Sequence, residues 1–263
     1  MNIATWNVNS LKIRFDQVID FLLKNNIDIL CLQETKIIDD NFPHEEFSKF
    51  GYQSYFYGQK TYNGVAIISR YKAIEVTYGI KNYIDEQKRV VSITVNVNNF
   101  DLRIICVYCP NGQSLESDKF KYKMEWFSHL TTFIHNELSN YNHLIVLGDY
   151  NIAPSDDDVY DKDIWQNTIL VSKDERKSFA NLISLGLNDL FNKFYQPPKS
   201  FTWWDYRNYS FVKNNGLRID HILASNDINA ICESFNINIE MRKKERPSDH
   251  APVSIRLKLD KIS

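Results

Sequence analysis

The stretch HLIVLGDYN, residues 143–151, combines the features that decide both the fold and the chemistry of this chain. Residues 143–147 form an apolar run that ends at Gly148, which predicts a strand buried on both faces. Asp149 and Asn151 follow two positions apart, so an extended backbone would place both side chains on one face. A carboxylate beside an amide can bind a cation and donate a hydrogen bond to an oxyanion. Taken alone, the letters GDYN are also typical of a tight turn.

Apolar runs alternate with amphipathic stretches along the rest of the chain, which predicts an α/β protein with mixed sheets and helices outside. Strands are expected at residues 2–6, 28–32, 64–69, 90–97, 102–108, 143–147, 201–206, 218–224, 235–240 and 253–259. One helix is expected to begin at a cap on Ser10 and to run to about residue 26. Others are expected at 116–139 and 179–185, with loops and helical fragments across 150–178. No linker-like or repeated stretch interrupts this order, so residues 1–263 are expected to form a single domain.

The composition limits the classes of function. The chain carries 31 basic and 33 acidic side chains, a formal net charge of −2. Nucleic-acid binders usually show a basic domain or face, so any polyanion site must be a local concentration of Lys and Arg. An apolar content of 43% is ample for a large core and argues against disorder. The first residues show no secretory signal, and no apolar run approaches the ~18 residues that span a bilayer.

Four cysteines, Cys31, Cys106, Cys109 and Cys232, are too few for a disulfide scaffold in a chain of this length. Cys106 and Cys109 form a C-x-x-C motif in a strand-like run, where residues three apart point to opposite faces. That arrangement suits neither a redox dithiol nor a zinc site, and the sequence has no second C-x-x-C. We therefore expect reduced, buried thiols in a cytoplasmic protein.

Polar residues recur where other strands are expected to end, and loops at strand ends are where rigid sheets present catalytic groups. Asn7 and Asn9 follow the first strand, Glu34 follows the second in LQETK, and Tyr108 ends another. Each has a plain alternative. The asparagines favour turns, and Glu34 could open a helix or pair with Lys36.

Asp220 and His250 form the strongest pair of candidates. Asp220 lies within the apolar run of residues 218–224, where a buried carboxylate needs a partner to offset its desolvation. A lone histidine is more often structural, but His250 follows Asp249 directly, and an aspartate that orients an imidazole is a general arrangement for acid–base catalysis. Oxygen ligands without clustered thiols favour Mg²⁺ or Mn²⁺ over zinc. Together these residues predict attack of water on a phosphodiester whose charge a metal offsets.

Seven strings occur in a fixed order from one end of the chain to the other: TWNVNSL, LQETK, YCPNGQS, GDYNIAP, WWDYR, GLRIDHILAS and PSDHAPV. Together they resemble the exonuclease III family of abasic-site endonucleases, within the endonuclease/exonuclease/phosphatase superfamily. LQET and SDHAPV are shared across the superfamily, whereas GLRIDHILAS with WWDYR and PNGQS is specific to the DNA-repair branch. The resemblance implies a four-layer α/β sandwich, in which two mixed β-sheets pack face to face with helices outside, as in deoxyribonuclease I.

The resemblance also implies roles for individual residues. The implied metal ligands are Asn7, Glu34, Asp149, Asn151, Asp249 and His250. The implied catalytic residues are Tyr108, Asp149, Asn151, Asp220 and His250. Among these, Asp149 would activate or deliver a proton and Asn151 would stabilise the transition state. Tyr108 would contact the scissile phosphate or assist the leaving group.

For DNA contact, the resemblance implies that Trp203, Trp204 and Leu217 lie beside a pocket for a flipped-out, baseless sugar, too closely walled for a nucleotide that keeps its base. One tryptophan could instead pack in the core while the other faces the groove. Further DNA contacts are implied for Arg89, Arg207 and Asn111. The loop before GLRID offers only Lys213 where related sequences often carry Arg, which predicts fewer phosphate contacts and weaker DNA binding.

The leading hypothesis is a Mg²⁺-dependent DNA-repair nuclease that incises 5′ to abasic sites, trims duplex DNA from 3′ ends and removes blocking 3′ groups. All three activities are one reaction, hydrolysis at a 3′ oxygen. The expected partner is double-stranded DNA with abasic sites or blocked 3′ ends. The protein is expected to act as a monomer and not to bind a membrane. The second hypothesis is a phosphoinositide or sphingolipid phosphoesterase, and the third is a non-enzymatic DNA-binding protein on the same fold.

Overall fold

Two six-stranded β-sheets form the centre of the computed structural model, which describes residues 1–98 and 100–259. The first sheet has the spatial order β11 (Cys232–Ile237), β12 (Val253–Leu257), β1 (Asn2–Asn7), β2 (Ile29–Gln33), β4 (Val65–Ser69) and β3 (Gln53–Tyr57). The second has the order β5 (Ala73–Tyr78), β6 (Val90–Val97), β7 (Phe100–Tyr108), β8 (Leu144–Asp149), β10 (Asp220–Ala224) and β9 (Asn188–Asp189). β1 pairs with β2 and β7 with β8 in parallel, and their other neighbours are antiparallel, so both sheets are mixed.

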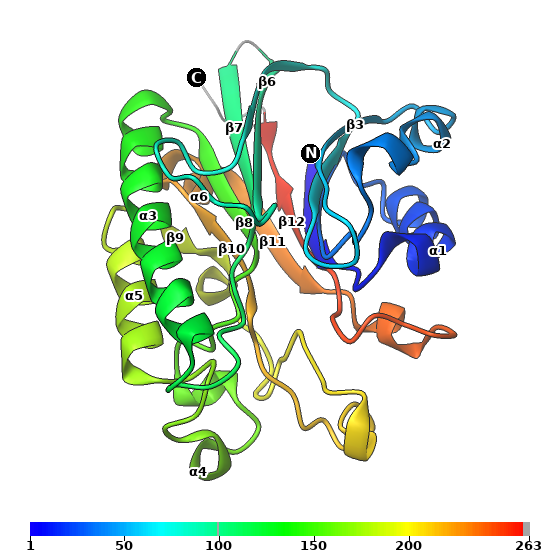
Figure 1. The fold of residues 1–263 in the computed structure, drawn as a ribbon. Coiled ribbons are helices and arrows are strands. Elements are labelled where there is room, and N and C mark those ends of the chain that lie inside the picture. Colours follow the sequence, from blue (N-terminus) through cyan, green and yellow to red (C-terminus); the bar gives the residue numbers. More distant parts are fainter. Residues whose placement is uncertain (99, 260–263) are drawn as a thin grey trace.

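Helices cover the outer face of each sheet and complete four layers (Figure 1). The helices beside the first sheet are α1 (Leu11–Lys24) and α2 (His44–Ser48), and those beside the second are α3 (Asp118–Asn140) and α5 (Lys173–Ile183). Short helices stand in the connections: α4 (Lys162–Trp165), α6 (Asn226–Ile231), and the 3₁₀ turns η1 (Asp39–Asn41), η2 (Asp156–Asp158), η3 (Leu190–Lys193), η4 (Arg207–Tyr209) and η5 (Ile239–Lys243). The four-layer α/β sandwich predicted from the sequence is confirmed.

Three large apolar clusters hold the layers together. The cluster between the sheets contains Ile3 from the first sheet and Ile104 from the second. Trp126 of α3 lies in the cluster under the second sheet, and Leu22 of α1 lies in the cluster under the first. Burial of apolar surface is worth about 25 cal/mol per Å². These clusters therefore supply most of the free energy that keeps the strand ends in place.

β1 and β8 end at the same edge of the sandwich. Asn7 closes β1, Asp149 closes β8, and their side chains are hydrogen bonded across the two sheets. Gly148 allows β8 to lie close to β7 at this point, because a Cβ atom there would come within 1.9 Å of the main-chain oxygen of Val107. The segments that lead into β10 and β12, yellow to orange-red in Figure 1, project beyond this edge.

The start of α1 differs from the sequence-based expectation. The Ser10 side chain makes no capping hydrogen bond. Instead, the main-chain N–H groups of Ser10 and Leu11 donate to the carbonyl oxygens of Glu34 and Thr35, at 2.7 and 3.1 Å. The loop after β2 therefore caps the helix, and the helix in turn fixes the backbone of Glu34.

Other boundaries also differ. The prediction of a strand at residues 201–206 is wrong, because within it Trp203 makes isolated bridges only, to Leu217 and His250. α5 begins at Lys173 rather than 179, because Ser172 and Glu175 form a capping box. The strand expected at 235–240 lies three residues earlier, at β11. β3, β5 and α6 lie outside the expected elements.

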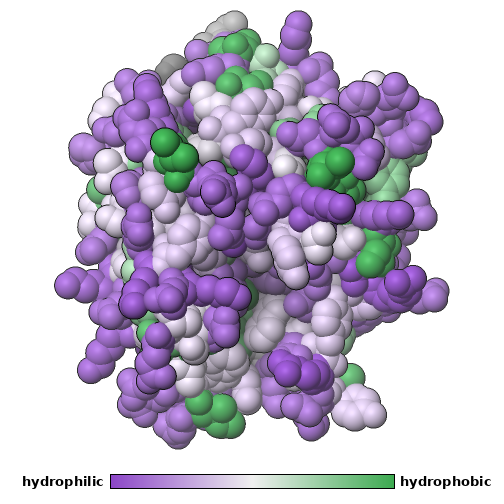
Figure 2. Space-filling model, viewed as in Figure 1, coloured by the Kyte–Doolittle hydropathy of each residue, from purple (hydrophilic) through white to green (hydrophobic). Residues whose placement is uncertain are grey.

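All four cysteines are buried and free, as expected. Cys106 lies in the cluster between the sheets and Cys109 in the cluster under α3 and α5, so the two thiols face opposite sides of the second sheet. No helix in residues 1–98 and 100–259 is long and apolar enough to cross a membrane. Figure 2 shows a mostly hydrophilic face with scattered apolar side chains.

Candidate active site

An imidazole lies between two buried carboxylates at the shared edge of the sheets. Asp149 ends β8 and Asp220 begins β10, and the two are direct partners across the antiparallel pair. His250 Nδ1 lies 2.9 Å from Asp220 Oδ2, and His250 Nε2 lies 3.7 Å from Asp149 Oδ2. One ligand atom from each of these three residues lies within 4.8 Å of the others, close enough for the three to share a metal ion.

The protonation of this cluster follows from burial and charge. Burial raises the pKa of Asp149 to about 7, against the lowering effect of His250. Burial alone would lower the pKa of His250, but Asp220 and Asp149 raise it to about 10. The imidazole is therefore held as a cation by two acids, and the proton on Asp149 exchanges near neutral pH.

Neighbouring main-chain and hydroxyl groups fix the position of His250. Its carbonyl oxygen accepts from the indole N–H of Trp6 at 3.1 Å, and its N–H donates to Ser248 Oγ at 3.2 Å. The Ser248 hydroxyl donates to the carbonyl oxygen of Asn7 at 2.6 Å. The C-terminal segment is thus tied to β1, and Asp220 is the partner of His250 that the sequence predicts.

Asn7 connects the two sheets through its side-chain amide. Its Nδ2 atom donates to Glu34 Oε1 and to Asp149 Oδ2, both at 2.9 Å. Lys36 Nζ lies 3.0 Å from the other carboxylate oxygen of Glu34. Glu34 therefore lies at the predicted site. It also forms the ion pair with Lys36 that was its alternative role in the sequence analysis.

Asn151 reaches Asp149 through a turn rather than along a strand. Its φ angle is 50°, and its main-chain N–H donates to Asp149 Oδ1 at 2.9 Å. Its side-chain amide donates to Cys109 O at 3.0 Å and, more weakly, to Asp149 Oδ2 at 3.3 Å, and it accepts from Asn111 Nδ2 at 3.1 Å. Proximity of Asp149 and Asn151 is therefore found, but the expectation of extended backbone is wrong.

Tyr108 ends β7 beside this group and is almost fully buried. Burial and the neighbouring Glu34 hold the pKa of Tyr108 well above its usual range, so its hydroxyl stays protonated and can donate. The Arg89 guanidinium lies 4.8 Å from the Tyr108 ring and donates to the Tyr108 carbonyl oxygen at 3.1 Å. Arg89 is itself buried and donates a hydrogen bond to the Gln87 side chain. The guanidinium therefore lies behind Tyr108 rather than on the surface.

Asp249 lies outside the cluster of Asp149, Asp220 and His250. Its two carboxylate oxygens accept from Asn9 Nδ2 and Trp203 Nε1, both at 3.0 Å. Although burial raises it, the net pKa of Asp249 is lowered by His250 and by these two donors. Its charge is therefore already satisfied by neutral hydrogen-bond donors.

Asn9 is more than the turn residue that its sequence position favours. It accepts from Lys36 Nζ at 2.6 Å, and Arg14 donates to its carbonyl oxygen. A continuous chain of contacts thus joins Trp203 and Asp249, through Asn9 and Lys36, to Glu34. The Lys36–Glu34 pair is the one that the sequence suggests, whereas the contact of Lys36 with Asn9 joins residues 27 positions apart and has no local sequence signal.

The residues expected to contact DNA lie at different depths. Trp204 and Leu217 are completely buried, and the Trp204 indole donates to Asn214 Oδ1 at 3.0 Å, so neither side chain can touch DNA in this conformation. Trp203 is half-buried beside Asp249. Arg207 is exposed and pairs with Asp205.

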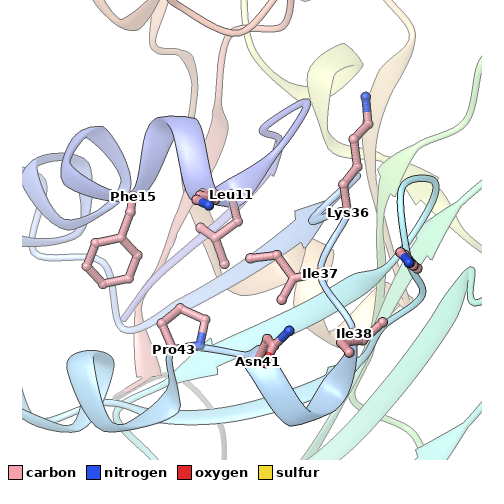
Figure 3. A pocket seen from close by; sticks show the side chains of 9 residues that line it. Leu11, Phe15, Lys36, Ile37, Ile38, Asn41 and Pro43 are labelled. Carbon is pink, nitrogen blue, oxygen red and sulfur yellow. The ribbon is translucent and has the colours of Figure 1, made fainter.

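A pocket of about 720 Å³ lies between α1 and the loop after β2. Figure 3 shows Leu11 and Phe15 of α1 on one side and Ile37 and Pro43 on the other, with the Lys36 side chain directed away from them. The charged residues that line it are all basic: Lys12, Lys36 and Lys60. In a chain of net charge −2, these three lysines form a local group of positive charge.

Comparison with known proteins agrees with the fold. The sequence model described as the endonuclease/exonuclease/phosphatase family matches residues 4–250. The chain is 33% identical over 262 residues to exodeoxyribonuclease III of Haemophilus influenzae, across 96% of this chain and 98% of that protein. A 3′ phosphatase from Neisseria, solved with a product DNA hairpin, is 44% identical, with a TM-score of 0.95 across 98% of this chain and 99% of that one. An AP endonuclease from Archaeoglobus fulgidus is 31% identical, with a TM-score of 0.93 across 98% and 100%. This chain therefore belongs to the endonuclease/exonuclease/phosphatase family.

Proposed function

We propose that this chain is a metal-dependent DNA-repair nuclease that hydrolyses phosphate esters at the 3′ oxygen of DNA. The observation that carries the proposal is the position of His250, whose Nδ1 is held by Asp220 while its Nε2 faces Asp149. The three relatives described above are an exodeoxyribonuclease III, a 3′ phosphatase and an AP endonuclease. Their names correspond to one reaction on three DNA substrates: a 3′-terminal nucleotide, a 3′-phosphate and an abasic site.

The side chains at this edge fit a divalent cation. Asp149 and Asp220 are buried carboxylates, and burial disfavours the ionised form of Asp149, so a bound cation would stabilise its charge. Carboxylate and amide oxygens favour Mg²⁺, with Mn²⁺ as the alternative. We propose that the ligands come from the predicted set Asn7, Glu34, Asp149, Asn151, Asp249 and His250, of which His250 could bind only after losing the proton that makes its ring a cation. A cation bound there would neutralise charge on a non-bridging phosphate oxygen.

The residues around the cation have separate tasks in the proposed reaction. A water molecule loses a proton as its oxygen bonds to phosphorus, the bond from phosphorus to the 3′ oxygen breaks, and that oxygen takes up a proton. Asp149 can hold or release this proton near neutral pH, because its pKa is about 7. The Asn151 amide and the protonated Tyr108 hydroxyl can donate to the phosphate oxygens as their charge grows. Asp220 keeps the His250 ring in one orientation throughout.

DNA would lie across this edge. The lysine-rich pocket between α1 and the loop after β2 is suited to the phosphate backbone, since Lys and Arg contacts to phosphate dominate the affinity of such interfaces. Trp203, Asn111 and Arg207 remain candidates for direct contact, because each lies at the edge or is exposed. Arg89, Trp204 and Leu217 would act from beneath the surface.

We further propose a single domain that works as a monomer in the cytoplasm. The cluster between the sheets draws on both sheets, from β1 to β12, which supports one folding unit. The four free thiols agree with a reducing compartment, which supports the cytoplasmic location. Sedimentation of the purified chain with and without duplex DNA measures the oligomeric state.

The decisive experiment offers the purified chain a set of labelled duplexes with Mg²⁺. One carries a tetrahydrofuran abasic analogue, one a 3′-phosphate and one a plain recessed 3′ end. A soluble inositol phosphate and sphingomyelin vesicles are tested in parallel. We expect cleavage of DNA that leaves 3′-hydroxyl ends and stops on addition of EDTA. Release of phosphate or phosphocholine from the lipid-type substrates alone would instead support the second hypothesis.

His250→Ala and a matched control decide whether this site does the chemistry. His135 lies on the exposed face of α3, so His135→Ala should keep the activity of the unchanged chain. His250→Ala should lose at least 10² in kcat, because general acid–base groups contribute about 10²–10⁴. Equal activity of the two variants would contradict the mechanism.

A further inference from the structure

A buried ion pair lies behind the candidate active site, between the two long helices of the second sheet. The side chains of Lys123 in α3 and Glu175 in α5 are fully buried, and Lys123 Nζ lies 2.5 Å from Glu175 Oε1. Removing two charges from water is costly, and apolar side chains of the same size often serve stability equally well. The pair therefore requires an explanation other than stability.

The ammonium group of Lys123 joins this pair to two loops of the site. It donates to the main-chain oxygen of Asn151 at 2.7 Å and to that of Asn111 at 3.1 Å. With Glu175 these partners use all three of its N–H donors. Asn111 follows β7 and Asn151 follows β8, so one side chain holds together the loops that leave two adjacent strands.

Glu175 is fixed as firmly as its partner. Its Oε1 atom also accepts from the main-chain N–H of Leu170 at 3.0 Å. Its Oε2 atom accepts from the N–H and the hydroxyl of Ser172, at 2.9 and 2.6 Å. The capping box of α5 therefore fixes the carboxylate, and the carboxylate fixes the ammonium group.

The held loops carry the amides that face the catalytic acid. Asn111 Nδ2 donates to Asn151 Oδ1 at 3.1 Å, and Asn151 Nδ2 lies 3.3 Å from Asp149 Oδ2. The left-handed backbone of Asn151 directs its carbonyl oxygen towards Lys123 and its side chain towards Asp149. A shift of that carbonyl would consequently move the amide.

We propose that Lys123 and Glu175 form a positioning pair that sets the Asn111 and Asn151 amides against Asp149. The inference rests on the proposed nuclease function, in which Asn151 donates to the phosphate. Lys123 and Glu175 touch the loops from the helix side and act through the main chain. Because the Asn151 contact strengthens as charge develops in the transition state, loss of the pair should lower kcat more than it raises KM.

The first test removes both charges at once in Lys123→Met/Glu175→Gln, so that neither is left buried alone. A displacement of about 1 Å can cost about 10² in rate, so we expect kcat to fall at least tenfold. KM for duplex DNA should stay within about threefold. A wild-type kcat in this folded double variant would overturn the inference.

The matched control is another buried pair on the same helix. Glu137 of α3 accepts from Arg103 Nε at 2.6 Å, and Arg103 lies five residues before Tyr108 on β7, away from the site. Arg103→Met/Glu137→Gln perturbs α3 and β7 without touching the two loops. Its kcat should remain close to that of the unchanged chain, and an equal loss in both double variants would assign the effect to stability.

A second variant tests the inference if the first double variant does not fold. Lys123→Arg keeps the charge beside Glu175, but a planar guanidinium cannot direct its donors as the ammonium group does. We expect it to fold and still to lose kcat, with shifted side-chain amide NMR signals of Asn111 and Asn151. Those signals decide the positioning role even if the unchanged chain cleaves no DNA, a result that would refute the proposed function alone. Unshifted signals in both Lys123 variants would refute the positioning role.

Discussion

Asp149 and Asp220 face each other directly across the antiparallel strands β8 and β10. Two like charges in this relation repel each other, and burial makes the repulsion stronger. His250 contacts Asp220 and approaches Asp149, so one cation compensates two acids. Asp220 thus fixes the orientation of the imidazole, while burial, with a smaller contribution from Asp220, leaves Asp149 with a proton that exchanges near neutral pH.

Asp220→Asn should lower kcat by about 10²–10⁴ while KM changes little. The substitution keeps the shape of the side chain but removes the charge that stabilises the His250 cation. Steady-state kinetics on a 3′-phosphate duplex measures the effect. Asp227→Asn, an exposed aspartate at the start of α6, is the control and should behave as the unchanged chain.

Stability of the metal-free chain should depend on pH through Asp149. Its usual pKa is 3.8, and burial raises it to about 7 in the folded chain. The folded state therefore binds the extra proton between about pH 4 and 7, and stability falls as pH rises through that window. Compared with Asp149→Asn, the unchanged chain should lose melting temperature from pH 4 to pH 7, and Mg²⁺ should reduce that loss. Parallel curves for the two proteins would contradict the shifted pKa.

Glu34→Gln should raise the Mg²⁺ concentration needed for half-maximal activity by about tenfold or more. Loss of a metal ligand, or of a residue that orients one, typically weakens metal binding by that factor. Glu34 also receives the Asn7 amide, so the loss of charge affects both sheets. Titration of activity with Mg²⁺ after treatment with EDTA gives the measurement. Glu46→Gln, on exposed α2, provides the comparison.

Arg89→Met should lower kcat without changing the salt dependence of DNA binding. Arg89 is buried and stacks on Tyr108, so its removal loosens the tyrosine rather than a phosphate contact. Lys12→Met, at the rim of the pocket, should instead reduce the slope of log affinity against log salt by about 1. Binding titrations at several salt concentrations distinguish the two, and a reduced slope for Arg89→Met would restore it as a DNA contact.

Trp204→Ala should lower the free energy of unfolding by about 3–5 kcal/mol, the usual cost for a buried tryptophan. Trp203→Ala should cost less stability, because Trp203 is only half-buried, and should lower activity through loss of its bond to Asp249. Urea denaturation and DNA cleavage of both variants provide the comparison. If Trp204→Ala were stable and inactive, a direct role of Trp204 with substrate would follow.

The parts of the site that lie at strand ends were accessible from the sequence. Apolar runs marked β1, β2, β7 and β8, and the polar residues just after them meet because these strands end at one edge. Asp220 needed a partner because it lies in an apolar strand, and His250 was the histidine with an acidic neighbour. These inferences rest on local pattern and on the cost of burying charge.

Contacts between distant segments were not accessible in this way. Lys123 and Glu175 are 52 residues apart, and nothing near either one indicates the other. The Ser172–Glu175 capping box, in contrast, was visible as S-x-x-E before α5, so the late start expected for that helix was avoidable. Trp203 and Trp204 read alike in sequence, and only the fold distinguishes the half-buried one from the buried one.

The adjacency of β1 and β12 has a consequence for synthesis of the protein on the ribosome. Asn7 is made well before His250, so a nascent chain cannot assemble the cluster until the segment that carries His250 and β12 emerges. Until then β1 presents an open sheet edge, which is prone to pair with other chains. A product truncated before residue 250 would consequently be an aggregation hazard without being a nuclease. DNA-cleaving activity would thus require synthesis to proceed past His250.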